Sequence, residues 1–244
     1  MRVYKKFLFW LMALLITACG AKPEYIPDPT PSPAVQVRLD PLVEWLQPAI
    51  QTCSRQIPER NWIILPSELS LSETVETNVQ FLYGKGTSLS ENTFLITNDR
   101  LLVVTNPANP IPSLTASEIR SIFSGKISQW DEVVENLPAD DIRVWLYPQT
   151  LSIMDNFIQW SGLSPQSLTP LAFLAPHPHE LRKAIADDPL AIGILSTRWL
   201  NDEIVAVEVE GEQNNAEFPV LASVNATDGY IQEWLFCIQN QIRP

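Results

Sequence analysis

Residue types that could do chemistry are few in this chain. Its two histidines, His177 and His179, lie in the run Pro176–Glu180, where a His-x-His-Glu pattern could contribute to a metal site. The flanking prolines favour a solvated loop instead, and the sequence shows no third and fourth ligand. Paired carboxylates at 140–141 and 187–188 flank predicted elements, where caps and turns are their ordinary roles. We therefore predict no metal and no cofactor.

The spacings that define common catalytic and nucleotide-binding motifs are also missing. The sequence contains no GxSxG, HExxH, CxxC or P-loop pattern. No nucleophile with a neighbouring base is visible, so we predict that the chain is not an enzyme. A hydrolase would need a catalytic pair in a cleft, and replacing Asp40 by alanine would then abolish turnover without changing stability.

The first eighteen residues have the layout of an export signal. Three basic residues precede an apolar run, Phe7–Ile16, which is shorter than the roughly 20 residues that span a bilayer. The run ends in Ile16–Cys19, Ile-Thr-Ala-Cys, which resembles the lipobox of bacterial lipoproteins. That resemblance implies a signal peptide over 1–18 and a lipid on Cys19. A helix that stays in the membrane is the alternative.

A proline-rich stretch separates Cys19 from the rest of the chain. Five prolines between Ala21 and Pro33 favour an extended, semi-rigid conformation, so we predict a tether over 19–33. Two or more acyl chains anchor a protein stably. We therefore expect an extracytoplasmic protein, lipid-anchored to a bacterial membrane, at the outer face of the cell membrane or in the periplasm.

The charge of the chain excludes some partners. The formal net charge is −12, and removing 1–18 with its three basic residues makes it −15. A body with no basic patch argues against nucleic acid and against electrostatic binding to an anionic membrane. The charge serves solubility in the simplest interpretation. We expect a monomer that reaches the membrane through its lipid anchor.

Strand patterns alternate with helical patterns, which predicts an α/β fold. The clearest helix begins at Thr115, where Glu118 three residues later completes a capping box and Gly125 supplies the stop. Asn98-Asp99 is predicted to be a turn between two strands. The predicted strands cover 35–37, 62–65, 78–83, 94–96, 101–105, 142–147, 191–195, 205–209 and 218–224.

One long stretch carries a family resemblance. Residues 106–130 read NPANPIPSLTASEIRSIFSGKISQW. They resemble the extracytoplasmic phosphate-binding proteins of ABC importers, in which "NP.NP" precedes "LT…I(F).GKI..W". Asp188–Gly193 is similar to the family's "P.AIGY". The resemblance implies a two-lobed type II periplasmic-binding fold with a hinge near 106–110 between the lobes. Lobe one would cover 34–105 and 199–244, and lobe two 106–198.

The resemblance also bears on the two remaining cysteines, Cys53 and Cys237. Outside the cytoplasm an even pair favours a disulfide, with two buried thiols as the alternative. In the implied fold the final helix packs back on lobe one. Cys237 then returns to the lobe that holds Cys53, which favours the disulfide.

Ligands bind beyond the carboxyl ends of the strands in open α/β sheets. This rule places six residues in the cleft: Arg38, Asp40, Tyr83, Gln149, Thr150 and Ser152. Each also has a structural interpretation. Asp40 and Thr150 could serve as helix caps and nothing more. Arg38 could be a surface cation, and Tyr83 could be a core residue with its hydroxyl in water. Gln149 and Ser152 could be ordinary residues of a loop and a first helical turn.

The function implied by the resemblance is capture of a small solute for an ABC permease. The family's glycine-rich loops are missing at 37–40 and 148–152. Helix N-termini remain there and could offer backbone N–H groups to phosphate or another oxyanion. The alternative is a lipoprotein with a degenerate binding fold, acting as a sensor or protein-interaction module without solute transport.

Overall fold

The computed structural model describes residues 34–65, 78–84, 91–109, 111–135, 138–211 and 216–243. Every element below belongs to one compact unit, Pro33–Pro244. The predicted signal peptide, Cys19 and the whole predicted tether lie outside the described residues. Within the described ranges, no helix combines the length and apolar character needed to cross a membrane.

The predicted α/β fold is confirmed. One nine-stranded sheet has the order β2-β1-β3-β11-β4-β8-β6-β7, with β9 also paired to β4, and β5 and β10 form a second sheet. The strands are β1 (Val35–Leu39), β2 (Trp62–Ile64), β3 (Val79–Tyr83), β4 (Asn92–Thr105), β5 (Ser113–Thr115), β6 (Arg143–Leu146), β7 (Phe173–Leu174), β8 (Ala191–Ser196), β9 (Val205–Ala206), β10 (Glu208–Glu210) and β11 (Glu217–Val224).

The helices cover the sheet at both ends of the unit. They are α2 (Gln47–Gln56), α3 (Ala116–Phe123), α4 (Ser152–Ser161), α5 (Pro178–Asp187) and α6 (Gly229–Ile242). Short 3-10 turns are η1 (Pro41–Leu46), η3 (Trp130–Glu132), η4 (Pro165–Ser167) and η5 (Thr197–Trp199). Pro48 lies in the first turn of α2, where a missing N–H costs nothing, so it starts the α-helix after η1.

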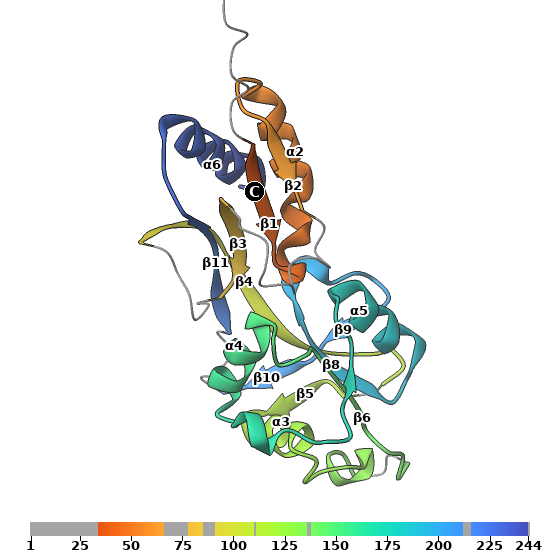
Figure 1. Ribbon diagram of the computed structural model, residues 1–244. Helices are drawn as coiled ribbons and strands as arrows, with labels where there is room; N and C mark the ends of the chain where they lie inside the picture. The colour runs from red at the N-terminus through yellow and green to blue at the C-terminus, as the bar shows by residue number, and fades with distance from the viewer. Residues whose placement is uncertain are drawn as a thin grey trace, which may run out of the picture. The chain divides into compact units, whose positions relative to one another are not determined.

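Strand β4 joins two halves of this unit. Its residues up to Arg100 pair with β11, and from Leu101 onward they pair with β8. We define lobe one as β1, β2, β3, β11 and the first part of β4, with α2 and α6. Lobe two is the rest of β4 and β5 to β10, with α3, α4 and α5. Figure 1 shows lobe one in the upper part of the view and lobe two below it.

Strand pairing bears on the two predicted crossings between lobes, which stay predictions. The partner change in β4 falls between Arg100 and Leu101, ahead of the crossing predicted near 106. After the return predicted near 199, β9 and β10 still pair with β4 and β5 of lobe two. The predicted turn at Asn98-Asp99 is wrong, because both residues lie inside the continuous strand β4 and pair with β11.

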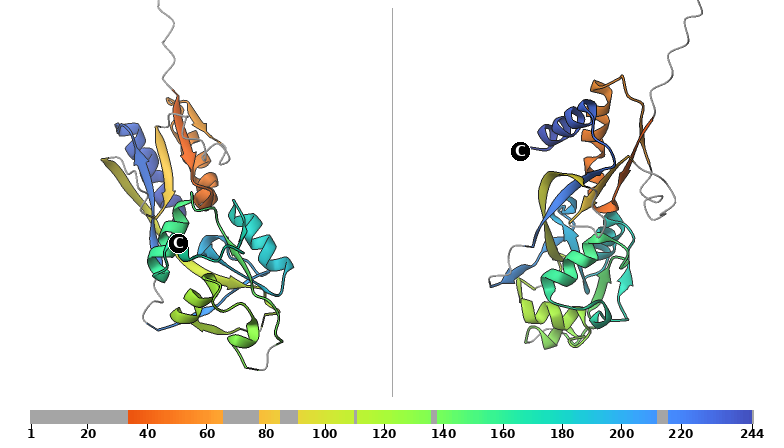
Figure 2. Two further views of the ribbon diagram at one scale, coloured as in Figure 1. Left: turned by 60° about the horizontal axis from the view of Figure 1, so that its bottom comes forward. Right: turned by 60° about the vertical axis from the view of Figure 1, so that its left-hand side comes forward.

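A disulfide links the two helices of lobe one, α2 and α6, as predicted. Cys53 of α2 and Cys237 of α6 are bonded at 2.02 Å, with their Cα atoms 5.8 Å apart. The two helices lie side by side in Figures 1 and 2. Beside this bond the Trp234 indole is fully buried and stacks on Trp62 at 4.3 Å between ring centroids. The disulfide thus joins α2 to the end of the chain over an aromatic core.

The helix predicted at Thr115 is confirmed in detail. Thr115 accepts a hydrogen bond from the Glu118 N–H, and the Glu118 carboxylate accepts one from the Thr115 N–H, which completes the capping box. Gly125 follows α3 with a φ of 73°, the left-handed conformation that glycine adopts most easily. The helical part of the stretch 106–130, which resembles the phosphate-binding proteins, is therefore helix α3 of lobe two.

Candidate functional site

Asp40 lies at the point where the carboxyl end of β1 meets η1. Its carboxylate accepts a hydrogen bond from the Leu42 N–H at 2.8 Å, so the predicted capping role is confirmed. The side chain is nevertheless buried, at 8% exposure. Burial raises the pKa of this carboxyl to about 6, although the hydrogen bonds from Leu42 and Ser152 lower it. Asp40 is therefore an acceptor or an acid poised near neutral pH.

Lobe two reaches Asp40 through the first turn of α4. The Ser152 hydroxyl donates a hydrogen bond to the second oxygen of Asp40 at 2.8 Å. One turn later the Asn156 side-chain amide donates to the Tyr83 carbonyl at 3.3 Å. Gly84 permits this approach, because a Cβ there would lie 1.7 Å from the Asn156 amide nitrogen. The carboxyl ends of β1 and β3 in lobe one thus face the start of α4 in lobe two.

Two tyrosines with unpartnered hydroxyls flank this contact. Tyr83 ends β3 in lobe one, and Tyr147 follows β6 in lobe two. Both side chains are fully buried, and neither hydroxyl has a hydrogen-bond partner among the described residues. Burial raises both pKa values well above the ordinary value for tyrosine, and the nearby charge of Asp40 raises them further. Both phenols therefore stay protonated and remain available as hydrogen-bond donors.

Tyr147 was missed by the sequence prediction. The rule that selected Tyr83, a polar residue at the carboxyl end of a strand, applies equally to Tyr147. It was assigned to the predicted strand 142–147, whereas β6 ends at Leu146. The signal was therefore present, but it depended on a strand end that a hydrophobic pattern locates only to within a few residues.

The other predicted residues lie in different surroundings. Arg38 is buried in β1 at 8% exposure, so a surface cation is the wrong interpretation for it. Gln149 is exposed and donates to the Pro165 carbonyl at 3.4 Å. Thr150 is also exposed and does not cap α4, whose N-cap is Leu151 without a side-chain hydrogen bond. The residues brought together are Asp40, Tyr83 and Ser152, with Tyr147 added by the structure.

A second buried carboxyl lies where β4 changes lobes. Asp99 accepts a hydrogen bond from the hydroxyl of Ser196, the last residue of β8, and another from the Arg100 N–H. Burial raises its pKa, while Ser196 lowers it. Asp99 also contributes to raising the pKa of Tyr83. The junction between lobes therefore contains two buried carboxyls, Asp40 and Asp99, and the Tyr83 hydroxyl is within electrostatic reach of both.

This set of groups is suited to holding a ligand by hydrogen bonds. Two phenol hydroxyls without partners among the described residues can donate, from Tyr83 and Tyr147. The Ser152 hydroxyl already donates to Asp40, whose carboxyl can accept further hydrogen bonds. A ligand that offers lone pairs to the phenols and one proton to Asp40 would satisfy all of them. Across the described ranges, no group of three or more His, Cys, Asp or Glu side chains is placed to hold a metal ion.

Comparison with known proteins agrees with this picture. No protein-family profile matches the chain. Over 128 residues it is 27% identical to the phosphate-binding protein PstS of Bacillus subtilis (strain 168), which covers 48% of this chain and 40% of that protein. The match thus spans less than half the length of this curated relative.

Solved structures cover more of the chain. A phosphate ABC transporter substrate-binding protein from Clostridium perfringens with bound phosphate matches 84% of this chain and 93% of its own, with a TM-score of 0.72 and 17% identity. A variant of the OxyR2 regulatory domain from Vibrio vulnificus matches 86% of this chain and 98% of its own, with a TM-score of 0.58 and 14% identity. At these identities the likeness establishes the fold.

The comparisons define the fold of the chain. It is the type II periplasmic-binding fold, and the polar groups described above lie where its two lobes meet. The resemblance to phosphate-binding proteins of ABC importers, predicted from residues 106–130, is confirmed.

Proposed function

We propose that this chain is an extracytoplasmic solute-binding lipoprotein that captures phosphate or another small oxyanion between its lobes and delivers it to an ABC permease. One observation carries the proposal. Two fully buried tyrosine hydroxyls, one from each lobe, have no hydrogen-bond partner among the residues that the structure describes, and both interact with the buried carboxyl of Asp40. Burying a hydroxyl without a hydrogen bond costs about 1–3 kcal/mol. A ligand that accepts from both phenols would remove that cost in the closed form.

The proposed lobe movement uses the two chain crossings. Ser152 and Asn156 of α4 contact lobe one at Asp40 and at the Tyr83 carbonyl. Opening about the crossings would break these two hydrogen bonds and expose the phenols. In this proposal the chain passes from lobe one to lobe two between Arg100 and Leu101, and it returns to lobe one after β10.

The experiment is thermal unfolding of the full chain in non-ionic detergent against phosphate, other oxyanions, sugars and amino acids. A ligand at a thousand times its Kd raises the free energy of unfolding by about 4 kcal/mol, which shifts Tm by several degrees. Tyr147→Phe should fold and lose most of this shift. The matched control is Tyr230→Phe, because Tyr230 is 43% exposed on α6 and lies outside the site.

The outcome separates two functions. A shift with an oxyanion that Tyr147→Phe abolishes supports capture. An absence of any shift over the whole panel would reject capture. It would favour the alternative, a sensor or protein-interaction module, for which the fold shared with the OxyR2 regulatory domain is the supporting observation.

The lipid anchor is a separate part of the proposal. It rests on the lipobox-like residues 16–19 after a short apolar run. Cys19→Ala should leave the precursor uncleaved and without lipid label in cells fed a labelled fatty acid. Mature, labelled protein from the Cys19→Ala variant would reject the assignment.

A further inference from the structure

Lobe two contains a cavity at the opposite end of β6 from Tyr147. Its walls come from the turn after β4 and from the segments that precede β6 and β8. Because β6 and β8 are parallel, their starting ends lie together, away from the carboxyl end of β6 where the cleft residues are. The cavity has a volume of about 180 Å³ and is lined by Asn109, Trp130, Pro138, Asp140, Pro189 and Leu190.

The two asparagines of the turn after β4 differ sharply in their bonding. Asn106 uses its whole amide: the nitrogen donates to the carbonyls of Ile185 and Ala186 at 3.1 and 2.6 Å, and the oxygen accepts from the Ala108 N–H. This network fixes the turn to the end of α5. Asn109 is 7% exposed, yet neither its amide oxygen nor its amide nitrogen has a partner among the described residues. The Asn109 backbone N–H donates to the Asn106 carbonyl at 2.9 Å, and the Asn109 side chain belongs to the lining of the cavity.

The walls of the cavity are apolar and fixed in position. The Trp130 indole N–H donates to the Leu190 carbonyl at 3.3 Å, and the Trp130 backbone N–H donates to the Asp140 carbonyl at 3.0 Å. Trp130 is 3% exposed, so it does not rotate freely. The volume of about 180 Å³ is well above the roughly 10–15 Å³ that one water molecule needs, so the cavity can admit a group larger than water.

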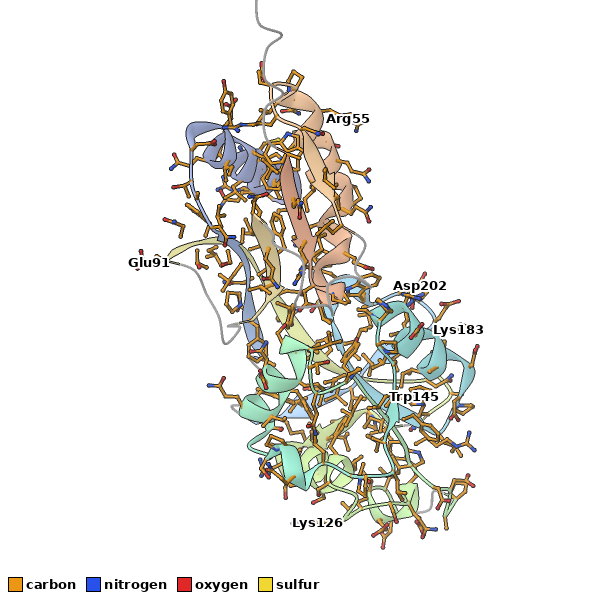
Figure 3. The ribbon with its side chains drawn as sticks, viewed as in Figure 1. Arg55, Glu91, Lys126, Trp145, Lys183 and Asp202 are labelled. Carbon is orange, nitrogen blue, oxygen red and sulfur yellow. A yellow bond between two sulfur atoms is a disulfide. The ribbon has the colours of Figure 1, made fainter. Side chains whose placement is uncertain are left out.

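The charge at the cavity is negative. Asp140 is exposed at its rim, and no cation pairs with its carboxylate within the part of the chain that the structure describes. The neighbouring Arg143 is already paired with Asp188 at 2.9 Å. Lys126 lies at the lower end of lobe two in Figure 3 but is not part of the lining. Further exposed carboxylates on the same segments are Asp131, Glu132, Glu135 and Asp141.

We propose that this cavity binds a basic residue in an extended peptide segment of a partner protein. The Asn109 amide can accept from the backbone N–H of that residue and donate to its carbonyl, which satisfies both unpartnered atoms at once. The methylene stem of the basic side chain lies on Trp130 and Leu190. Its guanidinium donates to Asp140, where charge-assisted hydrogen bonds are strong. The exposed carboxylates of Asp131, Glu132, Glu135 and Asp141 supply long-range complementarity.

The test uses N-acetyl-L-arginine N-methylamide as the probe and the 15N-labelled full chain in detergent. We expect a saturable shift of the Trp130 indole N–H signal. Asp140→Asn should weaken binding about tenfold, because it removes one charge-assisted interaction. Asp141→Asn is the matched control, since Asp141 is an exposed carboxylate one residue further on that does not line the cavity. The uncharged N-acetyl-norleucine N-methylamide should bind about tenfold more weakly than the arginine probe.

Three results would overturn the proposal. One is no saturable shift up to the solubility of the probe, and another is equal weakening by Asp140→Asn and Asp141→Asn. The third is tighter binding of free L-arginine, which lacks the acetylated N–H, than of the blocked probe. Asn109→Leu adds a measurement independent of the ligand. It should raise the melting temperature and abolish binding, whereas a fall like that of Asn106→Leu would show that the Asn109 amide has a structural partner.

Discussion

Replacing Asp40 by asparagine should stabilise the protein at neutral pH. The carboxyl has a pKa of about 6 in the folded chain against its ordinary value of 3.8, because burial disfavours the charged form. A difference of about 2 units corresponds to about 3 kcal/mol, since each unit is 1.36 kcal/mol. The hydrogen bonds from Leu42 and Ser152 are already included in that pKa. Asparagine keeps both contacts: its oxygen accepts from Leu42, and its amide donates to the Ser152 hydroxyl.

The sign of the pH dependence follows from the direction of the shift. Because the folded protein holds this proton more tightly than the unfolded chain, ionised Asp40 destabilises the fold above pH 6. That cost fades as the pH falls from about 6 toward 3.8. Asp40→Asn should therefore raise the free energy of unfolding at pH 7.5 by up to about 3 kcal/mol, or Tm by about 6 to 12 °C. At pH 3.5 the variant and the wild type should nearly coincide.

Urea unfolding of both proteins at pH 7.5 and pH 3.5 measures this difference directly. The wild type serves as the reference at each pH, so the titration of Asp99 cancels between the two proteins. A variant less stable than the wild type at pH 7.5 would refute the reasoning. The same would follow from a gain of equal size at both pH values, because the gain would then not come from the charge.

Two further predictions concern single contacts. Gly84→Ala should destabilise by at least about 2 kcal/mol, because the new Cβ displaces Asn156 in addition to straining a residue at φ 75°. Gly162→Ala, at φ 71° with no atom within 4 Å, carries the strain alone and should cost about 1 kcal/mol in the same denaturation assay; equal losses would contradict the clash. Replacing Cys53 and Cys237 together by serine should cost up to about 5 kcal/mol, because the bond closes a loop with a sequence separation of 184, and an unchanged urea midpoint would contradict this.

The proposals for the two sites differ in what each failure would mean. Loss of oxyanion binding in Tyr147→Phe tests the contact between the lobes, whereas Asp140→Asn tests a cavity at the other end of lobe two. The two variants lie at opposite ends of β6, before Arg143 and after Leu146. Each can therefore serve as a control for the other in both assays.

Local signals in the sequence predicted local structure well. The capping box of Thr115 and Glu118, the stop at Gly125 and the cap at Asp40 depend on residues within a few positions of each other. The same reliance on local signals explains the wrong prediction at Asn98-Asp99. Its turn propensity is a short-range preference, and it was overridden by pairing with β11, a strand more than a hundred residues away in the chain.

The sequence by itself determined the α/β class and the capped helix of lobe two. Its predicted strand ends were also sufficient to select Asp40, Tyr83 and Ser152, by the rule that ligands bind beyond the carboxyl ends of strands. Only the tertiary structure decided that Ser152 donates to Asp40. It also left the buried Tyr83 and Tyr147 hydroxyls without partners in the described part of the chain. It also decided that Asn106 is fully bonded while Asn109 is not. The physical reason is that hydrogen-bond satisfaction and desolvation depend on neighbours brought together from distant parts of the chain, and no local pattern contains those neighbours.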